Sequence, residues 1–290
     1  MARRRNSDYF DINDDVDNVN LASWANLGGD VFQPIHGFEQ KLPAGVYEIR
    51  TSQTGPKFAL SNTLNDSLIE FDGSVGKSLV EEVRRFWSLD SRFRENGFLH
   101  RRGYILHGPP GTGKTCLLAQ IIKNVIADKG IAIMVKDVRI VSEGLKLLRI
   151  VEPTRPVVCL LEDIDELLGY SEHELLAFLD GEDNIEHVVN LATTNHLEDL
   201  PDRIKARPRR FDRIVKIPAP TDMMRRKFLT EKFKFTDDPS GREKLEQLVM
   251  MTDRLTFAQL SDIAISVMCL DKPIEESVRS MRQMAGEQEF

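Results

Sequence analysis

Residues 108–115 read GPPGTGKT, which has the glycines, lysine and threonine of a phosphate-binding loop at the spacing such a loop needs. A short apolar run at 104–106 predicts a strand before the loop, and an apolar periodicity over 116–127 predicts a helix after it. The glycines let successive backbone N–H groups face phosphate oxygens, and the helix N-terminus adds positive partial charge. The motif therefore predicts a strand–loop–helix unit that binds phosphate.

Individual residues of the loop have distinct expected roles. Lys114 can reach the β- and γ-phosphates of a nucleoside triphosphate, and the Thr115 hydroxyl can bind Mg²⁺. We expect the nucleotide to be held by Gly108, Pro109, Pro110, Gly111, Thr112, Gly113, Lys114, Thr115 and Cys116. An ordinary glycine-rich turn is the alternative, and it is disfavoured because a strand and a helix flank the motif in the required order.

The pattern of strands and helices continues on both sides of the loop. Ser78, with Glu81 three residues later, predicts a helix start with a capping box. Further strands are predicted at 131–135, 157–161, 188–192 and 214–217, with helices around 143–150 and 173–179. Continuous β-branched runs between helices are typical of a parallel sheet covered on both faces. Beyond 218, helical patterns cover about 222–235, 241–251, 256–270 and 274–284.

Acidic and amide side chains follow two of the predicted strands. Glu162 is the first acid after 157–161 and is predicted to support the metal together with Thr115. Asp163 stands where a base or water-orienting group would stand, whereas Asp165 is read as a structural acid at a helix start. Asn195 follows the predicted strand at 188–192 and can hydrogen-bond a water or the γ-phosphate. Because several acids are adjacent, the assignment of these roles to Glu162, Asp163 and Asp165 stays open.

A basic cluster, RIKARPRRFDR, occupies residues 203–213, between Asn195 and the last strand. Such a cluster forms either a solvated face or a phosphate-binding patch. An arginine donated to the γ-phosphate of a neighbouring subunit can raise a hydrolysis rate by about a thousandfold or more.

Composition narrows the class of protein. The chain has 290 residues and a net charge of −7, and 41% of its residues are hydrophobic, which fits a globular protein of about two domains. The acidic balance disfavours bulk binding to nucleic acid or to an anionic membrane. Its apolar runs are too short for a transmembrane segment. Three scattered cysteines, Cys116, Cys159 and Cys269, favour reduced thiols and a cytoplasmic location.

Four regions are expected along the chain. Residues 1–23 are basic and then acidic and predict a weakly ordered tail. Residues 24–75 predict a small β-rich region, because β-rich runs at 46–50, 58–60 and 68–71 are punctuated by Gly, Pro and Asn. Residues 76–218 form the predicted α/β nucleotide-binding domain, and 219–290 the helical domain.

These elements, in this order over residues 76–270, resemble the AAA family of ATPases. GPPGTGKT is similar to the Walker A motif of that family, LLEDID at 160–165 to its Walker B motif, and ATTN at 192–195 to sensor 1. The segment ARPRRFDRIVKIPAP, at 206–220, is similar to its second region of homology. Within the family, the flanking sequences are most similar to the mitochondrial branch that exports the Rieske subunit of respiratory complex III. The layout is similar to that of compact bacterial and phage members.

The resemblance implies a P-loop NTPase sheet in strand order 5-1-4-3-2, an α-helical lid, and ATP and Mg²⁺ as cofactors. It makes Arg207 and Arg210 the arginine-finger candidates, with Arg209 as an alternative because it replaces the usual glycine. The chain also departs from the family. The Walker B order Glu162-Asp163 is exchanged relative to most members, and this exchange would slow hydrolysis. Residues 136–144, KDVRIVSEG, lack the pore-loop aromatic of threading members, and 256–259, TFAQ, lack a sensor-2 arginine.

The sequence therefore predicts an ATPase that converts ATP and water to ADP and phosphate in a homo-oligomeric ring of six or seven subunits. Such a ring would remodel or assemble a protein substrate, which the sequence does not identify. A nucleotide-gated assembly scaffold with slow hydrolysis is the alternative, in view of the exchanged acids and the missing aromatic. A nucleic-acid-handling relative is disfavoured by the acidic balance and by the lack of an aromatic and basic stretch of the kind that grips single strands; only the basic cluster at 203–213 favours it. Residues 24–75 are expected to select the partner.

Overall fold

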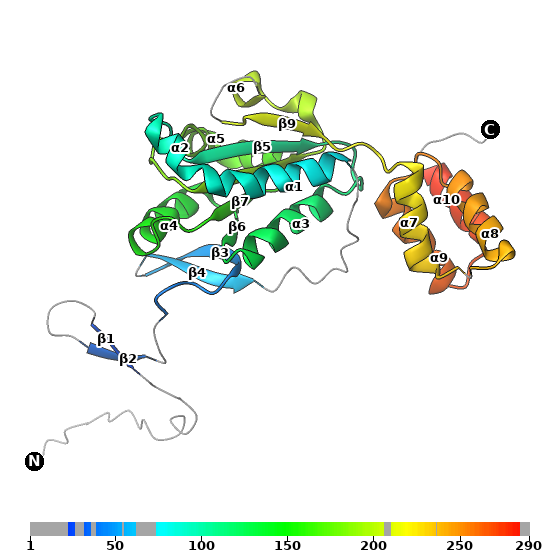
Figure 1. The fold of residues 1–290 in the computed structure, drawn as a ribbon, viewed down its shortest axis with the longest axis horizontal. Coiled ribbons are helices and arrows are strands. Elements are labelled where there is room, and N and C mark those ends of the chain that lie inside the picture. Colours follow the sequence, from blue (N-terminus) through cyan, green and yellow to red (C-terminus); the bar gives the residue numbers. More distant parts are fainter. Residues whose placement is uncertain are drawn as a thin grey trace, which may run out of the picture. The chain divides into compact units, whose positions relative to one another are not determined.

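The computed structural model describes residues 23–26, 32–35, 39–53, 55–61, 74–205, 210–235 and 237–284. The chain divides into two compact units, Met1–Leu42 and Pro43–Phe290 (Figure 1). In the first unit, β1 (Ser23–Asn26) pairs antiparallel with β2 (Phe32–Ile35). The predicted tail at 1–23 lies outside the described residues except for its last residue.

A seven-stranded sheet forms the centre of the second unit (Figure 1). In the order β4-β3-β6-β7-β8-β5-β9 its strands are Gly55–Ser61, Gly45–Ser52, Ile131–Met134, Val157–Leu161, Val188–Thr194, Arg101–His107 and Arg213–Lys216. The five strands predicted between residues 104 and 217 are confirmed. Numbered along the chain, these five lie in the order 5-1-4-3-2, as the resemblance implies. They are parallel to one another.

The hairpin of β3 and β4 extends this sheet beyond β6. Strand β3 pairs in parallel with β6, starting at Gly45 opposite Ile131, and antiparallel with β4. The two strands predicted at 46–50 and 58–60 thus join the main sheet and cover the edge that β6 would otherwise expose. The strand predicted at 68–71 lies outside the described residues. The boundaries at 75/76 and 218/219 stay predictions.

Helices flank the sheet (Figure 1). They are α1 (Ser74–Phe86), η1 (Trp87–Leu89), α2 (Asp90–Glu95), α3 (Lys114–Ala127), α4 (Val138–Val151), α5 (Ile164–Asp180), η2 (Leu197–Asp199) and α6 (Asp202–Lys205). The predicted helix start at Ser78 is wrong. Helix α1 begins four residues earlier, and the Ser78 hydroxyl donates to the carbonyl of Val75 within the helix. No capping box is therefore needed at Ser78.

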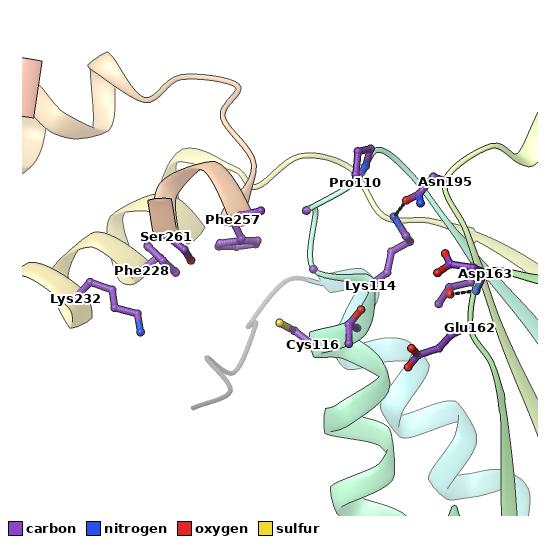
Figure 2. Close-up of a pocket in the computed structure, with 15 residues that line it drawn as sticks. Pro110, Lys114, Cys116, Glu162, Asp163, Asn195, Phe228, Lys232, Phe257 and Ser261 are labelled. Carbon is purple, nitrogen blue, oxygen red and sulfur yellow. Dashed lines mark hydrogen bonds between the residues drawn. The ribbon is translucent and has the colours of Figure 1, made fainter. Parts of the chain in front are cut away.

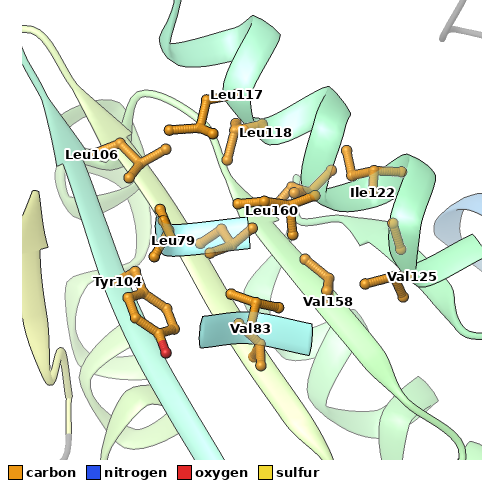
Figure 3. Close-up of a cluster of buried hydrophobic side chains, with 14 of the residues drawn as sticks. Leu79, Val83, Tyr104, Leu106, Leu117, Leu118, Ile122, Val125, Val158 and Leu160 are labelled. Atoms are coloured by element: carbon orange, nitrogen blue, oxygen red, sulfur yellow. The ribbon is translucent and has the colours of Figure 1, made fainter. Parts of the chain in front are cut away.

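Buried apolar side chains fix α1 and α3 to one face of the sheet (Figure 3). Leu79 of α1, Leu118 of α3 and Val158 of β7 are each at most 1% exposed. Burying each such side chain stabilises the fold by about 1.5–3 kcal/mol. Helix α4 lies against β3 and β4, and α5 against β8. Because α3 is anchored in this way, the loop before it is held in a fixed place at the carboxyl end of β5.

Four helices follow the last strand, as predicted: α7 (Asp222–Phe233), α8 (Pro239–Met251), α9 (Phe257–Met268) and α10 (Ile274–Met284). Phe228, Leu248 and Leu260 belong to their common apolar core. Thr256 caps α9, because its hydroxyl accepts from the Gln259 N–H while the Gln259 side chain accepts from the Thr256 N–H. Among the residues that the structure describes, no helix is long and apolar enough to cross a membrane.

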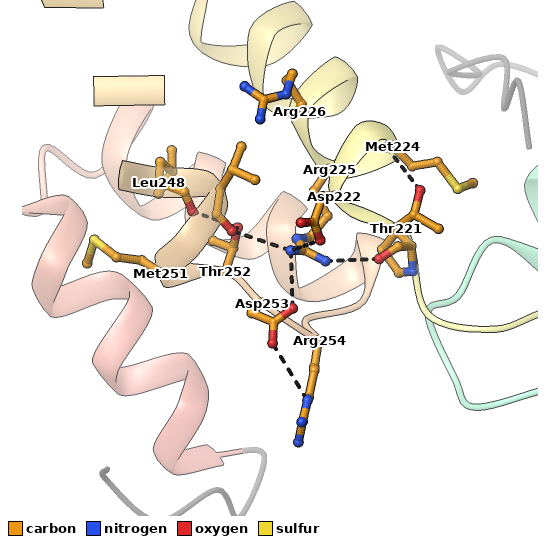
Figure 4. A network of polar contacts seen from close by, with 12 residues as sticks. Thr221, Asp222, Met224, Arg225, Arg226, Leu248, Met251, Thr252, Asp253 and Arg254 are labelled. Atoms are coloured by element: carbon orange, nitrogen blue, oxygen red, sulfur yellow. Dashed lines mark hydrogen bonds and ion pairs between the residues drawn. The ribbon is translucent and has the colours of Figure 1, made fainter. Parts of the chain in front are cut away.

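A buried arginine ties the entry of α7 to the end of α8 (Figure 4). The Arg225 guanidinium donates to the Pro220 carbonyl at 3.1 Å and to Asp222 Oδ1 at 2.7 Å. It also reaches Asp253 Oδ1, which follows α8, at 3.2 Å. These contacts fix the orientation of α7 within the helical region, because one rigid planar group serves several acceptors.

Candidate functional site

The loop between β5 and α3 is shaped by glycines that no other residue could replace without strain. Gly108, Gly111 and Gly113 have φ values of 154°, 75° and 101°. A Cβ atom on Gly108 would lie 2.2 Å from the backbone oxygen of Ile217, just beyond β9. The glycines therefore supply the backbone curl that was predicted for a phosphate-binding loop, and Gly108 also allows a close approach to Ile217 that was not predicted.

Replacing Gly108 with alanine is expected to lower the free energy of unfolding by about 1–3 kcal/mol, because backbone must move to admit the methyl group. Gly169 is a matched control within helix α5, where a Cβ would meet nothing within 4 Å. Gly169→Ala is expected to raise stability by about 0.5–1 kcal/mol. Denaturant titration of both variants checks this pair, and equal stabilities would contradict the tight packing of the loop.

The side chain of Lys114 joins the loop to the end of β8 (Figure 2). Its ammonium donates to Gly108 O at 2.7 Å, Pro109 O at 3.0 Å and Asn195 Oδ1 at 2.7 Å. Burial lowers the pKa of Lys114, and the nearby charge of Asp163 opposes that shift. A phosphate oxygen could take the place of one of these acceptors, because the ammonium has three hydrogens to donate.

Two acids follow β7, at the start of α5. Asp163 has a left-handed backbone conformation with φ 46°, and its N–H donates to Thr193 Oγ1 on β8 at 3.1 Å (Figure 2). Both Glu162 and Asp163 are exposed on the side of a cavity. Partial burial raises the pKa of Glu162, and the charge of Asp163 raises it further. The site therefore gathers negative charge opposite the lysine, an arrangement that suits a divalent cation bound with phosphates.

These groups line a cavity of about 580 Å³ (Figure 2). Nine of the predicted site residues line it: Pro110, Gly111, Gly113, Lys114, Thr115, Cys116, Glu162, Asp163 and Asn195. Gly108, Pro109 and Thr112 do not line the cavity but make hydrogen bonds within the loop. The carbonyl of Pro109 accepts from the Thr112 hydroxyl at 2.9 Å.

Six further residues of the lining were not predicted from the sequence: Thr193, Phe228, Lys232, Phe257, Ala258 and Ser261. Thr193 belongs to the ATTN segment, so its place beside Asn195 was a usable signal. Phe257 and Ala258 lie in TFAQ, a segment noted only for lacking an arginine. Phe228, Lys232 and Ser261 follow from tertiary packing, and nothing in the local sequence indicated them.

Arg210, the one finger candidate that the structure describes, is not among the residues that line the cavity. Arg210 is buried, and its guanidinium clasps Asp180 at the end of α5, with Nε to Oδ1 at 2.6 Å and Nη2 to Oδ2 at 2.8 Å. Its Nη1 donates to the Arg203 carbonyl at 2.6 Å. Arg207 and Arg209 lie outside the described residues. The structure thus gives Arg210 a binding partner that the sequence analysis did not foresee.

Comparison with known proteins adds an independent finding. Residues 104–219 match the AAA family, described as the ATPase family associated with various cellular activities. The chain is similar to the proteasome-activating nucleotidase of Aeropyrum pernix, at 32% identity over 196 residues, which are 60% of this chain and 46% of that protein. The corresponding nucleotidase of Methanosphaerula palustris is 34% identical over 166 residues, 49% of this chain and 40% of the relative. The chain thus spans about half the length of these curated relatives, 46% of the first.

Proposed function

We propose that the chain hydrolyses ATP in a ring of identical subunits and remodels or assembles a protein partner, because residues 104–219 match the AAA family of ATPases. One observation supports this proposal above the others. Lys114 from the loop, Glu162 and Asp163 after β7, and Asn195 after β8 converge on one cavity. Those groups are the ones that phosphoryl transfer to water needs.

The proposal gives each group a task. The loop amides and Lys114 would hold the phosphates of ATP. The hydroxyl of Thr115 and the carboxylate of Glu162 would hold Mg²⁺, since both are hard oxygen donors that line the cavity. The ion would neutralise charge on the phosphate oxygens. Asp163 would orient the attacking water and accept its proton, and Asn195 would position that water.

In the proposed ring, an arginine of one subunit completes the site of the next. The clasp between Arg210 and Asp180 uses the donors of Arg210 within its own subunit, which favours Arg207 or Arg209 as the finger. The ring would have six or seven members. The relatives are named as nucleotidases that activate the proteasome, and by analogy we propose that the partner here is also a protein.

Remodelling or assembly is favoured over threading of an unfolded chain. Residues 136–144 carry no aromatic side chain. Most of them begin helix α4, where the Asp137 side chain caps the helix by accepting from the Arg139 N–H at 2.9 Å. Gripping unfolded chain would call for an exposed apolar side chain there. Selection of the partner by residues 24–75 and a location in the cytoplasm remain parts of the proposal.

A scaffold with slow hydrolysis is the second candidate, because the shorter aspartate stands at the water-orienting position. Phosphate release from ATP, with Mg²⁺, separates the two candidates. For the motor, Asp163→Asn is expected to lower release by about a hundredfold or more while ADP binding persists, because only the proton acceptor is lost. A wild-type chain that binds ATP and releases phosphate no faster than Asp163→Asn would support the scaffold and contradict the motor.

A further inference from the structure

Two histidines and an aspartate meet at the amino edge of the sheet, away from the cavity at its carboxyl edge. His100 precedes β5 and His187 precedes β8, and these neighbouring parallel strands start side by side, with Arg101 opposite Val188. Asp90 is the first residue of α2. Among the described residues, these three alone bring metal-ligating atoms of three side chains within 4.8 Å of one another with histidine among them.

The distances between the ligand atoms suit a small metal ion. His100 Nδ1 lies 3.0 Å from His187 Nδ1 and 3.8 Å from Asp90 Oδ1. His187 Nε2 lies 3.6 Å from the same carboxylate oxygen. Ligand atoms about 2.0–2.2 Å from a tetrahedral zinc ion are about 3.3–3.6 Å apart. His187 contributes Nδ1 to the first of the measured distances and Nε2 to the third, and one ligand atom from each of the three residues lies within 4.8 Å of the other two. Movements of up to about an ångström would therefore bring three ligand atoms around one ion.

The hydrogen bonds leave ring nitrogens without protons at this point. His100 Nε2 lies 2.9 Å from the Phe86 carbonyl, which can only accept, so this nitrogen carries a hydrogen. In the neutral ring His100 Nδ1 is then an acceptor, and His187 Nδ1 must donate to it. That leaves His187 Nε2 without a hydrogen as it faces Asp90 Oδ1. Two acceptors thus face each other, and a cation would satisfy both. To bind the same ion, His100 Nδ1 would exchange the hydrogen bond from His187 Nδ1 for the metal.

The surroundings are those of a built metal site. Metal-binding histidines commonly donate their other N–H to a backbone carbonyl, as His100 does to Phe86. The His100 ring also stacks on the Phe86 ring, with centroids 4.1 Å apart, so both orientation and water access are controlled. His100 and His187 are 1% and 6% exposed, whereas the Asp90 side chain is 31% exposed and offers an entry path. Its other oxygen, Oδ2, accepts from Arg94 at 2.8 Å.

The backbone at His187 is a further sign of constraint. Its φ of 55° is left-handed, which costs a residue with a side chain about 1 kcal/mol or more. The conformation is held by the His187 N–H, which donates to the His100 carbonyl at 2.7 Å. Arg149 donates to the His187 carbonyl at 3.0 Å. The strained turn keeps the His187 ring beside His100 and Asp90.

We propose that Asp90, His100 and His187 bind a divalent transition-metal ion of the zinc class, with water as a further ligand on the Asp90 side. Imidazole ligands select such an ion over Mg²⁺ or Ca²⁺, which prefer all-oxygen sites. The ion fastens α2 to the amino ends of β5 and β8. The carboxyl ends of these two strands lead into the phosphate-binding loop and to Asn195, so the metal stabilises the strands that carry the cavity.

The test is a calorimetric titration of the full chain with Zn²⁺, after removal of metals with a chelator, without nucleotide and in excess Mg²⁺ to occupy oxygen-only sites. One Zn²⁺ per chain is expected. Asp90→Asn is expected to weaken the affinity at least about tenfold, and His187→Gln further. Asp199→Asn and His173→Gln, at exposed positions outside the cluster, are the matched controls and should bind as wild type does. Zn²⁺ should raise the melting temperature of wild type and of the controls by more than that of Asp90→Asn.

Several outcomes would overturn the proposal. Absence of saturable Zn²⁺ binding to wild type would do so. Zn²⁺ binding with the wild-type affinity in both Asp90→Asn and His187→Gln would do so as well. If His187→Gln fails to fold, Asp90→Asn still decides, because its side chain is partly exposed and its fold can be checked by circular dichroism. A third outcome is that Zn²⁺ leaves the melting temperature of wild type unchanged while acidic pH stabilises wild type and not Asp90→Asn. That result would mean that a protonated His187, and not a metal ion, faces Asp90.

Discussion

ATP turnover per subunit is expected to fall by about a hundredfold to a thousandfold when Lys114 is replaced with alanine. The ammonium of Lys114 points from the loop toward the cavity and already bridges Gly108 and Pro109 to Asn195. In the proposed reaction the ammonium stabilises the negative charge that develops on the phosphate oxygens. Its loss therefore weakens the binding of ATP and raises the free energy of the transition state. Phosphate release at saturating ATP, together with ADP binding, measures the two effects separately.

Lys244→Ala, at an exposed position on α8, is the matched control for the loss of one positive charge. Its turnover should equal that of wild type. Turnover near the wild-type rate in Lys114→Ala would mean that the cavity around the loop is not where ATP is hydrolysed, and the assignment of the site would have to be withdrawn.

Arg210→Ala is expected to destabilise the subunit itself, by about 3 kcal/mol or more. The Arg210 side chain is 2% exposed and its partner Asp180 is 21% exposed. Removing the guanidinium takes two hydrogen bonds from the mostly buried carboxylate of Asp180 and one from the Arg203 carbonyl. Lost activity in this variant would therefore not identify Arg210 as an arginine finger.

A double-mutant cycle with Asp180→Ala isolates this pair. If the clasp holds the end of α5 to the chain before β9, the free energies of unfolding lost in the two single variants should sum to more than the loss in the double variant. Additive losses, or an Arg210→Ala variant as stable as wild type, would show that the clasp contributes little. Arg210 would then be available to act on a neighbouring subunit.

Much of the fold could be predicted because its signals are local. Each central strand is a continuous apolar run, such as 157–161, bounded by polar residues, and buried parallel strands produce that pattern. The strand order came from the resemblance, since hydrophobic periodicity alone does not order strands. The pairing of β3 with β6 was not foreseen, because it joins residues far apart in the sequence and depends on which sheet edge is left uncovered.

The site was predicted where residue type and spacing carry the chemistry. The loop, Glu162, Asp163 and Asn195 meet in one cavity because each follows a strand of the same parallel sheet. The clasp of Arg210 on Asp180 could not be anticipated in this way, since thirty residues separate the partners and either side chain alone suggests a solvated charge. The same holds for His100 and His187, which are eighty-seven residues apart and give no motif.

Hydrolysis of ATP at sites shared between subunits of a ring is the main feature of the proposed function. It is tested most directly by ATP turnover per subunit over a wide range of protein concentrations, with the mass of the assembly measured in the same samples. Turnover is expected to rise with concentration and to reach its plateau where the ring forms. A monomer that hydrolyses ATP at the plateau rate would contradict the proposed function.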